Sequence, residues 1–526
     1  MSDPRERTVA DDVLEVLRDA GAGTVFGLPG VHNLAFFSTG PGSPTVVRHE
    51  QTAAYAADGW ARRTGRLGAA VVTTGPGATN ALTGFGEAAA AGSPVVLVAS
   101  EIPQRLRRTG RLRGVLHESR DQAAVFAPLA KAVFTPRTAD EAATAVREAA
   151  AVALAEPRGP VYVDVPADVL AEPAGTPGPG RATAVPAPAD SPGPELPAGH
   201  VVVWAGPGAV GAAGELAATA AHLGAPLVTA FGARGLPGAL AAPPHEPEIA
   251  GLVGSADVLL VVGGGLDGMN TRNWTMPRPP VLVTVDAAPP ADPPEWEPDV
   301  AVTGDVATVL AGLRAQPARE RWWDTAVADR VRDRLRADPA TAEAFALVEA
   351  VETVGTAGAA VVCDMAVAGY WTGGYARLSG PRGLAYPVGW GTLGFGLPAA
   401  VGVAATGVPT VAVVGDGGLA MAVGELATLV QERLPVVVLV VDDGGYGMLR
   451  YDQTRAGDPH AGVDLHGPDL VALAGAYGLD GVGATIGELP GVLRDAVAAR
   501  RPCLVRVTAT LLPPRTTSPR WHEATD

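Results

Sequence analysis

Short apolar runs alternate with Ala-rich segments of helical spacing along most of the chain. In the first third, the runs read GTVFGLPG, TVVRHE, AAVVTTGPG, PVVLVASE and PVYVDVP. Most are rich in Val and bounded by Gly or Pro, which is typical of buried strands. Because these strands alternate with helices, the pattern predicts an α/β fold built on parallel sheets.

The pattern divides the chain into three blocks. We expect a first domain over 1–172, a Pro- and Ala-rich linker over 173–199, a middle domain over 200–315, a charged helical connector over 316–345 and a third domain over 346–526. The linker has no apolar period and is rich in Pro and Gly, which is the composition of an extended spacer. A length of 526 residues agrees with several domains.

The first and third blocks share a similar stretch. AAVVTTGPGATNALTGFGEAAAAGSPVVLVASE, which begins at Ala69, resembles TVAVVGDGGLAMAVGELATLVQERLPVVVLVVDD, which begins at Thr410. Both show a strand, Gly-x-Gly, a helix with a Gly-Glu step, Pro and a second strand. Two domains of one fold would produce this repeat. Only the third-block copy has an acid at the end of each of its two strands.

The overall charge limits the partners of the protein. The net charge is −16, from 39 basic and 55 acidic residues. Nucleic acid and anionic membranes require a basic face, so we expect neither as a partner. No apolar run of about 20 residues occurs, and we expect no membrane span. Lys131 is the only lysine, so a Schiff-base mechanism has a single candidate.

Cysteine usage and the N-terminal segment indicate the compartment. Cys363 and Cys503 lie in apolar runs, which predicts buried thiols in a reducing environment. The segment MSDPRERTVADDVLEVLRDAG begins polar and becomes amphipathic, unlike a secretory signal. We therefore expect a cytoplasmic protein.

Acidic side chains follow two apolar strands of the third block. Asp416 lies in GDG after TVAVV, and Asp443 lies in DDGG after PVVVLVV. Open parallel sheets bind ligands beyond the carboxyl ends of their strands, and two carboxylates suit Mg²⁺ or Ca²⁺. The neighbouring glycines allow backbone N–H groups to approach an anion. The pattern predicts a metal-bridged diphosphate site, although a single GDG also occurs in ordinary turns.

The spacing from GDG to DDGGYG resembles the thiamine diphosphate-binding motif of the acetolactate synthase, 2-oxo acid decarboxylase and benzaldehyde lyase family. VVRHEQTAAYAADGWARRTG, VVTTGPGATNALTG and GWGTLGFGLPAAVG are also similar to family segments, in the same order. The resemblance covers nearly the whole chain. It implies pyrimidine-binding and diphosphate-binding domains that flank a Rossmann-like middle domain.

The resemblance also implies the cofactors and the site residues. Thiamine diphosphate and Mg²⁺ are the implied cofactors. Asp416, Asp443 and the carbonyl of Gly445 would ligate the metal, and Gly417 and Gly418 would offer N–H groups to the diphosphate. A homodimer or homotetramer is implied, because the family's active sites lie between two chains.

The chain departs from the family pattern in two places. Asp443 stands where the family usually has asparagine, which adds one negative charge. Val367 and Ala368 stand where acetolactate synthases have Gln-His. This second change argues against a strict acetolactate synthase.

Further roles follow from the resemblance. Glu50, in RHEQTAAY, matches the glutamate that hydrogen-bonds the pyrimidine ring of the cofactor and shares a proton with it. Leu393, in GWGTLGFG, matches the bulky residue that holds the cofactor bent, and the Gly391 carbonyl would accept from its amine. Without these motifs, Glu50 would be a favourable charge at a helix N-terminus and Leu393 an ordinary core residue.

Two histidines are candidates for proton transfer to the substrate. His32 in GLPGVHNL matches a histidine of benzaldehyde lyase-like members, and His117 in RGVLHESRDQ falls where relatives have Gln. Either could shuttle protons near neutral pH, but a lone loop histidine is more often structural. Tyr446, Gly447 and Met448 are expected beside the cofactor, where the tail PPRTTSPRWHE would close the pocket.

The middle block contains GPGAVG at 206–211, which fits GxGxxG after the strand HVVVWA and indicates a dinucleotide site. An acid is expected about 20 residues further on, but APLVTAFG ends without Asp or Glu. We therefore expect a structural middle domain without FAD.

By resemblance, a thiazolium ylide attacks a 2-oxo acid, CO₂ leaves, and the enamine is protonated to an aldehyde or adds to a second carbonyl. The motifs do not separate decarboxylation from carboligation, nor one small 2-oxo acid or aldehyde from another. RGVLHE with YPVGWGTLG is similar to guanidino-type 2-oxo acid decarboxylases. Three alternatives stay open: an aldehyde carboligase or lyase of the benzaldehyde lyase type, a nucleotide-dependent oxidoreductase, and a catalytically silent cofactor-binding subunit.

Overall fold

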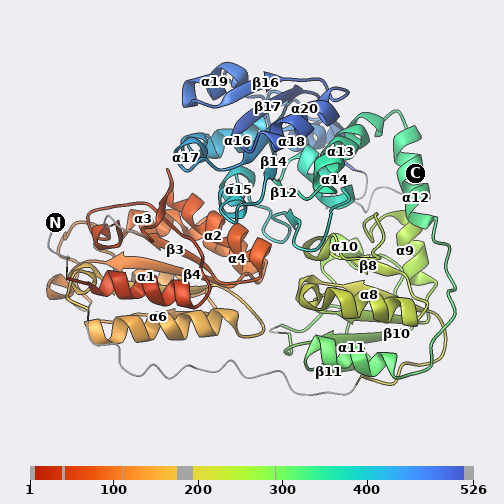
Figure 1. Cartoon of the computed structure of the whole chain (residues 1–526), viewed down its shortest axis with the longest axis horizontal. Helices are drawn as coiled ribbons and strands as arrows, with labels where there is room; N and C mark the ends of the chain where they lie inside the picture. The colour runs from red at the N-terminus through yellow and green to blue at the C-terminus, as the bar shows by residue number, and fades with distance from the viewer. Residues whose placement is uncertain (1–5, 38–41, 109, 175–192, 291, 515–526) are drawn as a thin grey trace.

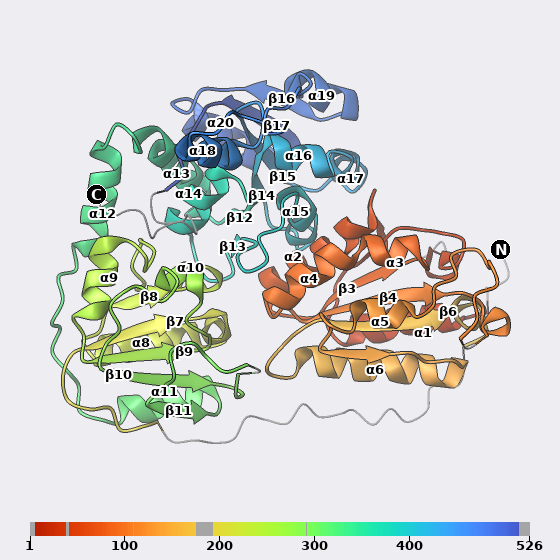
Figure 2. The ribbon, with the colours of Figure 1, turned by 180° about the vertical axis from the view of Figure 1, so that it is seen from behind.

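The computed structural model describes residues 6–37, 42–108, 110–174, 193–290 and 292–514. Three parallel sheets with helices packed on both faces form three bodies, and the third body lies across the other two (Figures 1 and 2). The α/β fold predicted from the apolar pattern is confirmed. The predicted linker over 173–199 lies largely outside the described residues, and the domain boundaries remain a prediction.

The first sheet contains six strands in the order β2-β1-β3-β4-β6-β5. Its strands are β1 (Val25–Gly27), β2 (Thr45–Val46), β3 (Gly68–Val72), β4 (Val95–Glu101), β5 (Ala132–Phe134) and β6 (Val161–Pro166). Its helices are α1 (Val9–Asp19), α2 (Glu50–Thr64), α3 (Pro76–Asn80), α4 (Leu82–Ala90), α5 (Gln122–Phe126), α6 (Ala139–Leu154) and α7 (Ala167–Leu170), with short 3₁₀ turns η1 (Leu34–Phe37) and η2 (Gln104–Leu106).

The middle sheet contains five strands in the order β11-β10-β9-β7-β8. Its strands are β7 (Val201–Ala205), β8 (Leu227–Thr229), β9 (Val258–Val262), β10 (Val281–Asp286) and β11 (Val300–Thr303). The 3₁₀ turns η3 (Pro207–Ala212) and η4 (Phe231–Ala233) and the helices α8 (Ala213–His222), α9 (Pro247–Gly254), α10 (Gly268–Thr271) and α11 (Val306–Arg314) connect them. Helix α12 (Val327–Ala337) then leads to the third body.

The third sheet contains six strands in the order β13-β12-β14-β15-β17-β16. Its strands are β12 (Ala360–Cys363), β13 (Leu384–Ala385), β14 (Thr410–Gly415), β15 (Val436–Asp442), β16 (Asp480–Gly483) and β17 (Cys503–Thr508). Its helices are α13 (Ala342–Gly355), α14 (Val367–Tyr375), α15 (Gly396–Ala404), α16 (Asp416–Ala422), α17 (Glu425–Gln431), α18 (Gly447–Ala456), α19 (Leu470–Tyr477) and α20 (Leu489–Ala498).

The first and third sheets have the same topology. When strands are numbered by their order within each sheet, both arrangements read 2-1-3-4-6-5. The strands β3 and β4 of the first sheet therefore correspond to β14 and β15 of the third. These are the two stretches that the sequence repeat predicted, and the structure extends the repeat to both whole sheets.

The equivalent helices α2 and α15 of this repeat pack directly against each other. A Cβ atom added at Gly59 of α2 would lie 2.3 Å from the carbonyl oxygen of Ala399, and one added at Gly402 of α15 would lie 1.8 Å from that of Ala56. Both positions therefore require glycine, because no side chain fits against the opposite backbone. The two contacts are reciprocal, so the two halves are related by an approximate two-fold arrangement.

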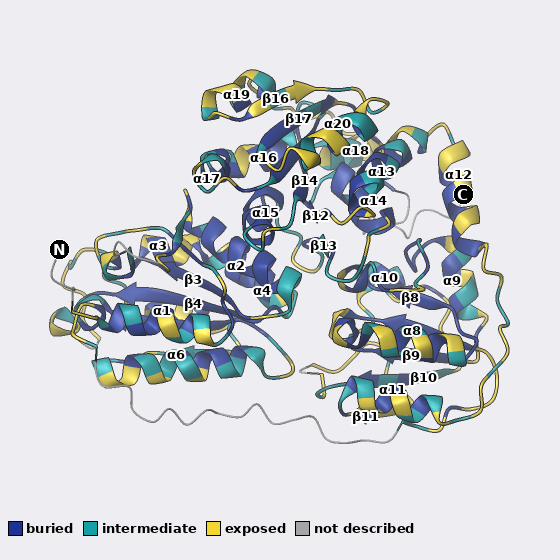
Figure 3. Cartoon of the chain, viewed as in Figure 1, coloured by how far each residue is buried: buried dark blue, intermediate teal, exposed yellow. Residues whose placement is uncertain are grey.

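The sequence pattern missed four strands: β5, β11, β13 and β16. All four lie at edges of their sheets. They are short, and β11 and β16 are mostly exposed. Central strands such as β4 and β9 are buried along their whole length, which gives continuous apolar runs (Figure 3). An edge strand lacks this signal, because one side of it faces solvent.

Two further predictions concern the core and the membrane. Cys363 and Cys503 are buried free thiols, as predicted. Within the described ranges, no helix combines the length and the apolar character needed to cross a membrane.

Candidate functional site

The two predicted acidic strand ends meet at one edge of the third sheet. Strands β14 and β15 are parallel neighbours, with Gly415 opposite Val441. Asp416 follows the first of these residues directly, and Asp443 follows the second by two positions. The register therefore brings both carboxylates to the same carboxyl edge, where ligands of parallel sheets bind.

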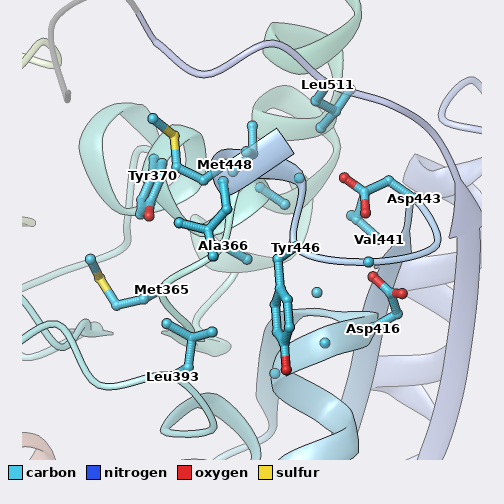
Figure 4. Close-up of a pocket in the computed structure, with 18 of the residues that line it drawn as sticks. Met365, Ala366, Tyr370, Leu393, Asp416, Val441, Asp443, Tyr446, Met448 and Leu511 are labelled. Carbon is cyan, nitrogen blue, oxygen red and sulfur yellow. The ribbon is translucent and has the colours of Figure 1, made fainter. Parts of the chain in front are cut away.

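A cavity opens at this edge (Figure 4). Asp416 and Asp443 lie on one side of it, and Met365, Tyr370 and Leu393 lie on the other. Its lining residues are Met365, Ala366, Val367, Ala368, Tyr370, Leu393, Gly415, Asp416, Gly417, Gly418, Val441, Asp443, Gly445, Tyr446, Gly447, Met448, Leu449, Ala509 and Leu511. The structure thus brings together all the residues predicted for the diphosphate and the metal, with Leu393 beside them.

The two carboxylates have oxygens that are available to a cation. Oδ1 of Asp416 and Oδ1 of Asp443 are both buried without a hydrogen-bond partner. Burial, with the charges of Asp443 and Asp442 adding to it, raises the pKa of Asp416 to about 6. A divalent ion between the two carboxylates would relieve this cost, since buried charges are stable only when paired or ligated.

Backbone groups would have to complete such a metal shell. Within the described residues, no group of three or more His, Cys, Asp and Glu side chains is arranged to hold a metal. Two carboxylates with carbonyl and phosphate oxygens would form a hard-ligand set that suits Mg²⁺. The donor set therefore fits the predicted metal-bridged diphosphate.

Glycines keep the floor of the cavity open. A Cβ atom at Gly417 would lie 2.7 Å from the ring of Tyr446, and one at Gly447 would lie 2.0 Å from Oδ2 of Asp443. Either substitution would force the site to rearrange. Tyr446 is fixed in turn, because its backbone N–H donates to the carbonyl of Val463 at 2.8 Å.

Asp364, at the end of β12, holds the loop that carries Leu393. Its carboxylate accepts hydrogen bonds from the backbone N–H groups of Gly394 at 3.0 Å and Gly396 at 3.1 Å. Asp364 is 1% exposed, and burial raises its pKa to about 6, against the effect of these hydrogen bonds. No role was predicted for Asp364 from the sequence. The available signal was a third acid at a strand end, in AAVVCD.

Two arginines, which the sequence analysis did not identify, lie against the acidic pair 442–443. Arg506 donates to Oδ2 of Asp442 at 2.7 Å. Arg450 lies 3.8 Å from Oδ1 of Asp443, and burial raises the pKa of Asp443 while Arg450 opposes the rise. No local sequence signal joins either pair, because sheet register and helix orientation bring them together.

Glu50 lies at the first position of α2, where it is 8% exposed. Its Oε2 accepts a hydrogen bond from Nδ2 of Asn80 at 3.0 Å. Asn80 ends α3, in the family-like segment GPGATN, and was not assigned a role from sequence. The preceding His49 accepts from the N–H of Gln51 at 3.2 Å and so caps the helix. The helix start thus presents one buried carboxylate with one neutral donor.

His32 and His117 are neighbours, with ring centroids 5.4 Å apart in an edge-to-face arrangement. Nδ1 of each is buried without a hydrogen-bond partner. Burial, and the proximity of His117, lower the pKa of His32. His117 adopts a φ of 65°, a strained conformation for a non-glycine residue. Gln122, also missed from sequence, fixes the adjacent turn by accepting from the N–H of Gly75 at 2.6 Å.

Within one chain, these first-domain residues do not reach the cavity. Every lining residue of the cavity belongs to the third body, and Glu50, His32 and His117 are not among them. Gly391 does not line it either, although a Cβ at Gly391 would lie 3.4 Å from the terminal methyl of Met365.

In the GxGxxG loop of the middle domain, two backbone N–H groups donate hydrogen bonds to carbonyls within the same domain. The N–H of Gly206 donates to the carbonyl of Val262 at 2.9 Å, and that of Gly208 donates to the carbonyl of Gly263 at 2.7 Å. A dinucleotide pyrophosphate needs such N–H groups. Asp286 ends β10, but β10 is not a neighbour of β7, so it does not replace the missing ribose acid.

Family models match the three bodies in turn. Residues 7–125 match the N-terminal TPP binding domain of the thiamine pyrophosphate enzymes, 197–313 match their central domain, and 364–507 match their C-terminal TPP binding domain.

Relatives with similar sequences carry two kinds of name. A probable 2-ketoarginine decarboxylase from Pseudomonas aeruginosa is 33% identical over 91% of this chain and 89% of its own length. The acetolactate synthase large subunit of Parasynechococcus marenigrum is 29% identical over 94% of this chain and 86% of its own length. The acetolactate synthase isozyme 3 large subunit of Escherichia coli is 29% identical over 90% and 89%.

Proposed function

This chain belongs to the thiamine pyrophosphate enzyme family, and we propose that it is a thiamine diphosphate- and Mg²⁺-dependent decarboxylase of a 2-oxo acid with a cationic tail. One observation carries the cofactor part of this proposal. The carboxylates of Asp416 and Asp443 share a cavity, and each has a buried oxygen without a hydrogen-bond partner.

The chain's own residues would hold and shape the cofactor. Asp416, Asp443 and the Gly445 carbonyl would ligate Mg²⁺ on the diphosphate, and Gly417 leaves room for it. Leu393, on the loop held by Asp364, would press the cofactor into a bent form. When bound, thiamine diphosphate supplies the electron sink that decarboxylation of a 2-oxo acid requires.

We further propose that the active site is completed by a second copy of the chain. Glu50, His32 and His117 would then reach the cavity of the partner copy. Exposed apolar side chains support this arrangement: Val31, beside His32, is 63% exposed, and Leu116, beside His117, is 61% exposed. Such side chains are typical of surfaces that are covered on assembly. In the assembled site, Glu50 would hold a proton at the pyrimidine ring, and the histidine pair would deliver one to the product.

The wall of the cavity opposite the carboxylates favours a substrate with an apolar chain and a positive end. Met365, Tyr370 and Met448 supply apolar surface. Asp452 lies four residues after Met448 on α18, which places it on the same face of the helix. Burial raises the pKa of Tyr370 to about 12, and the charges of Asp364 and Asp452 add to the rise, so Asp452 acts electrostatically on the wall.

The name of the Pseudomonas relative agrees with this chemistry, because 2-ketoarginine has a guanidinium group at the end of an aliphatic chain. The net charge of −16 also favours the approach of a cationic substrate. Loss of the Gln-His pair at Val367 and Ala368 argues against acetolactate synthase as the first candidate.

The test is CO₂ release and product mass with thiamine diphosphate and Mg²⁺, over pyruvate and branched, aromatic and guanidino 2-oxo acids. We expect an aldehyde from the guanidino acid, and a rise in KM for that acid alone in Asp452→Asn. Acetolactate from pyruvate would instead establish a synthase. Cofactor binding without turnover of any acid would favour an aldehyde carboligase or a silent subunit, and full turnover by Glu50→Gln would exclude the proposed proton transfer.

A further inference from the structure

Three carboxylates crowd the carboxyl edge of the third sheet. Asp442 is the last residue of β15, Asp443 follows it directly, and Asp416 follows β14. A diphosphate brings further negative charge to the same place. Even with one divalent cation, these neighbouring negative charges oppose binding of the diphosphate unless fixed positive groups offset them.

Arg450 supplies one such positive group through four contacts. It lies in the first turn of α18, and its side chain is 18% exposed. Its Nη1 donates to the backbone carbonyl of Asp443 at 3.2 Å and lies 3.8 Å from Oδ1 of the same residue. Its Nη2 donates to the carbonyl of Gly444 at 3.3 Å, and its Nε donates to Oδ1 of Asp464 at 2.9 Å.

These contacts offset the negative charge of Asp443 and leave its Oδ1, the proposed metal ligand, without a hydrogen bond. At 3.8 Å, Arg450 attracts Oδ1 of Asp443 but does not hydrogen-bond to it, and that oxygen has no other partner. The hydrogen bonds of the guanidinium go to the backbone carbonyls of Asp443 and Gly444 and to Asp464. Arg450 also packs closely on the loop, since a Cβ at Gly445 would lie 2.7 Å from its Nη2.

We propose that Arg450 is the charge-compensating partner of Asp443, and that its guanidinium is what allows an aspartate to serve at this position of a diphosphate site. This inference rests on the proposed function. In it, Arg450 is a positioning residue and Asp443 the metal ligand. Arg506 compensates the negative charge of Asp442 in the same way, through a contact of 2.7 Å between Nη2 and Oδ2.

The proposal makes a reciprocal prediction for binding. Arg450→Met leaves Asp443 uncompensated and is expected to weaken thiamine diphosphate binding at saturating Mg²⁺ about tenfold or more, as loss of one partner of a buried charge pair does. Asp443→Asn keeps an oxygen ligand and removes the excess charge. Combined with Arg450→Met, it is expected to restore the dissociation constant to within about threefold of the wild-type value, because the charge balance is the same.

Direct titration of each variant with thiamine diphosphate, by calorimetry or by quenching of intrinsic fluorescence, measures this without any turnover. Arg455→Met is the matched control, because it removes the same charge from an exposed position of the same helix. It should leave the affinity unchanged. Arg450→Lys, which keeps the charge but not the paired hydrogen bonds, should bind better than Arg450→Met.

The outcomes are distinct. Rescue of Arg450→Met by Asp443→Asn supports charge compensation. If Arg450 only braced the loop, the double variant would bind as weakly as Arg450→Met or more weakly, and the inference would be overturned. Wild-type protein that binds no thiamine diphosphate would overturn the proposed function itself.

Discussion

Glu425 accepts a hydrogen bond from the backbone N–H of Arg48 at 3.0 Å, across 377 residues of sequence. Its counterpart in the internal repeat, Glu87, accepts from Oγ1 of Thr392 at 2.9 Å. Arg48 precedes Glu50 by two residues, and Thr392 directly precedes Leu393. Each half of the repeat therefore holds, through one buried glutamate, the segment of the other half that carries a predicted cofactor residue.

Removing the first of these contacts should misplace Glu50. Glu425 is 1% exposed and also accepts from Oγ1 of Thr428. Glu425→Gln leaves one acceptor oxygen for these donors and turns an amide toward the N–H of Arg48. We expect kcat to fall about tenfold or more, because small displacements of catalytic groups are costly. The affinity for thiamine diphosphate should change little, since its diphosphate ligands lie elsewhere.

The matched control is Glu343→Gln, which makes the same change at an exposed position in the first turn of α13. Parallel measurement of kcat and of cofactor affinity separates positioning from binding. An unchanged kcat in Glu425→Gln would show that Glu50 does not depend on this contact.

The loop that carries Leu393 should depend on Asp364 in a similar way. Asp364→Asn keeps the volume but leaves one oxygen for the N–H groups of Gly394 and Gly396. We expect kcat to fall about tenfold, with Mg²⁺ affinity retained, because an unsatisfied buried N–H costs about 1–3 kcal/mol. Cofactor binding and kcat measured on the same preparation test this. A variant that loses Mg²⁺ binding and keeps its kcat at saturating metal would contradict it.

The close packing of α2 and α15 makes a stability prediction. A Cβ at Gly402 would lie 1.8 Å from the carbonyl oxygen of Ala56. Overpacking of a core typically costs 1–3 kcal/mol, and here the neighbour is rigid backbone, so we expect Gly402→Ala to destabilise by about 3 kcal/mol or to prevent folding.

Thermal melting of soluble variants measures this effect. Gly251→Ala is the control, because it changes an exposed helical glycine with open space around its Cβ position. That change should be neutral or stabilise by up to about 1 kcal/mol. Equal melting temperatures for both variants would refute the packing argument.

The middle domain should show a pH-dependent stability that comes from Asp286. Burial raises the pKa of this carboxyl to about 6 in the folded protein, while an N–H from Gly264 opposes the rise. Between about pH 4 and pH 6, the folded state therefore holds more protons than the unfolded state, and stability falls as pH rises through this window. The cost of ionisation is then fully present above pH 6.

Asp286→Asn removes that cost. We expect the variant to melt at a higher temperature than the wild type at pH 7, and the difference to shrink as the pH falls below about 5. Melting curves of both proteins across this range provide the test. A constant difference at all pH values would point to a packing effect instead of ionisation.

The sequence by itself determined the parallel-sheet architecture, the repeat between first and third domains, and the positions of Asp416 and Asp443 at strand ends. These features are local. Buried central strands require continuous apolar runs, and in the proposed site the glycines that would admit a diphosphate stand directly beside the acids that would bind its metal. A reader of the chain can see both without knowing which strands are neighbours.

The tertiary structure alone decided which groups surround these residues. Arg450 faces Asp443 because α18 turns back over the loop before it, and Asn80 reaches Glu50 because α3 ends beside the start of α2. Glu425 meets Arg48 only because two domains pack through equivalent helices. The four edge strands could not be predicted from the apolar pattern either, since a short strand with one side open to solvent needs no apolar run. Such contacts depend on register and crossing geometry, which a linear pattern of apolar and polar residues does not encode.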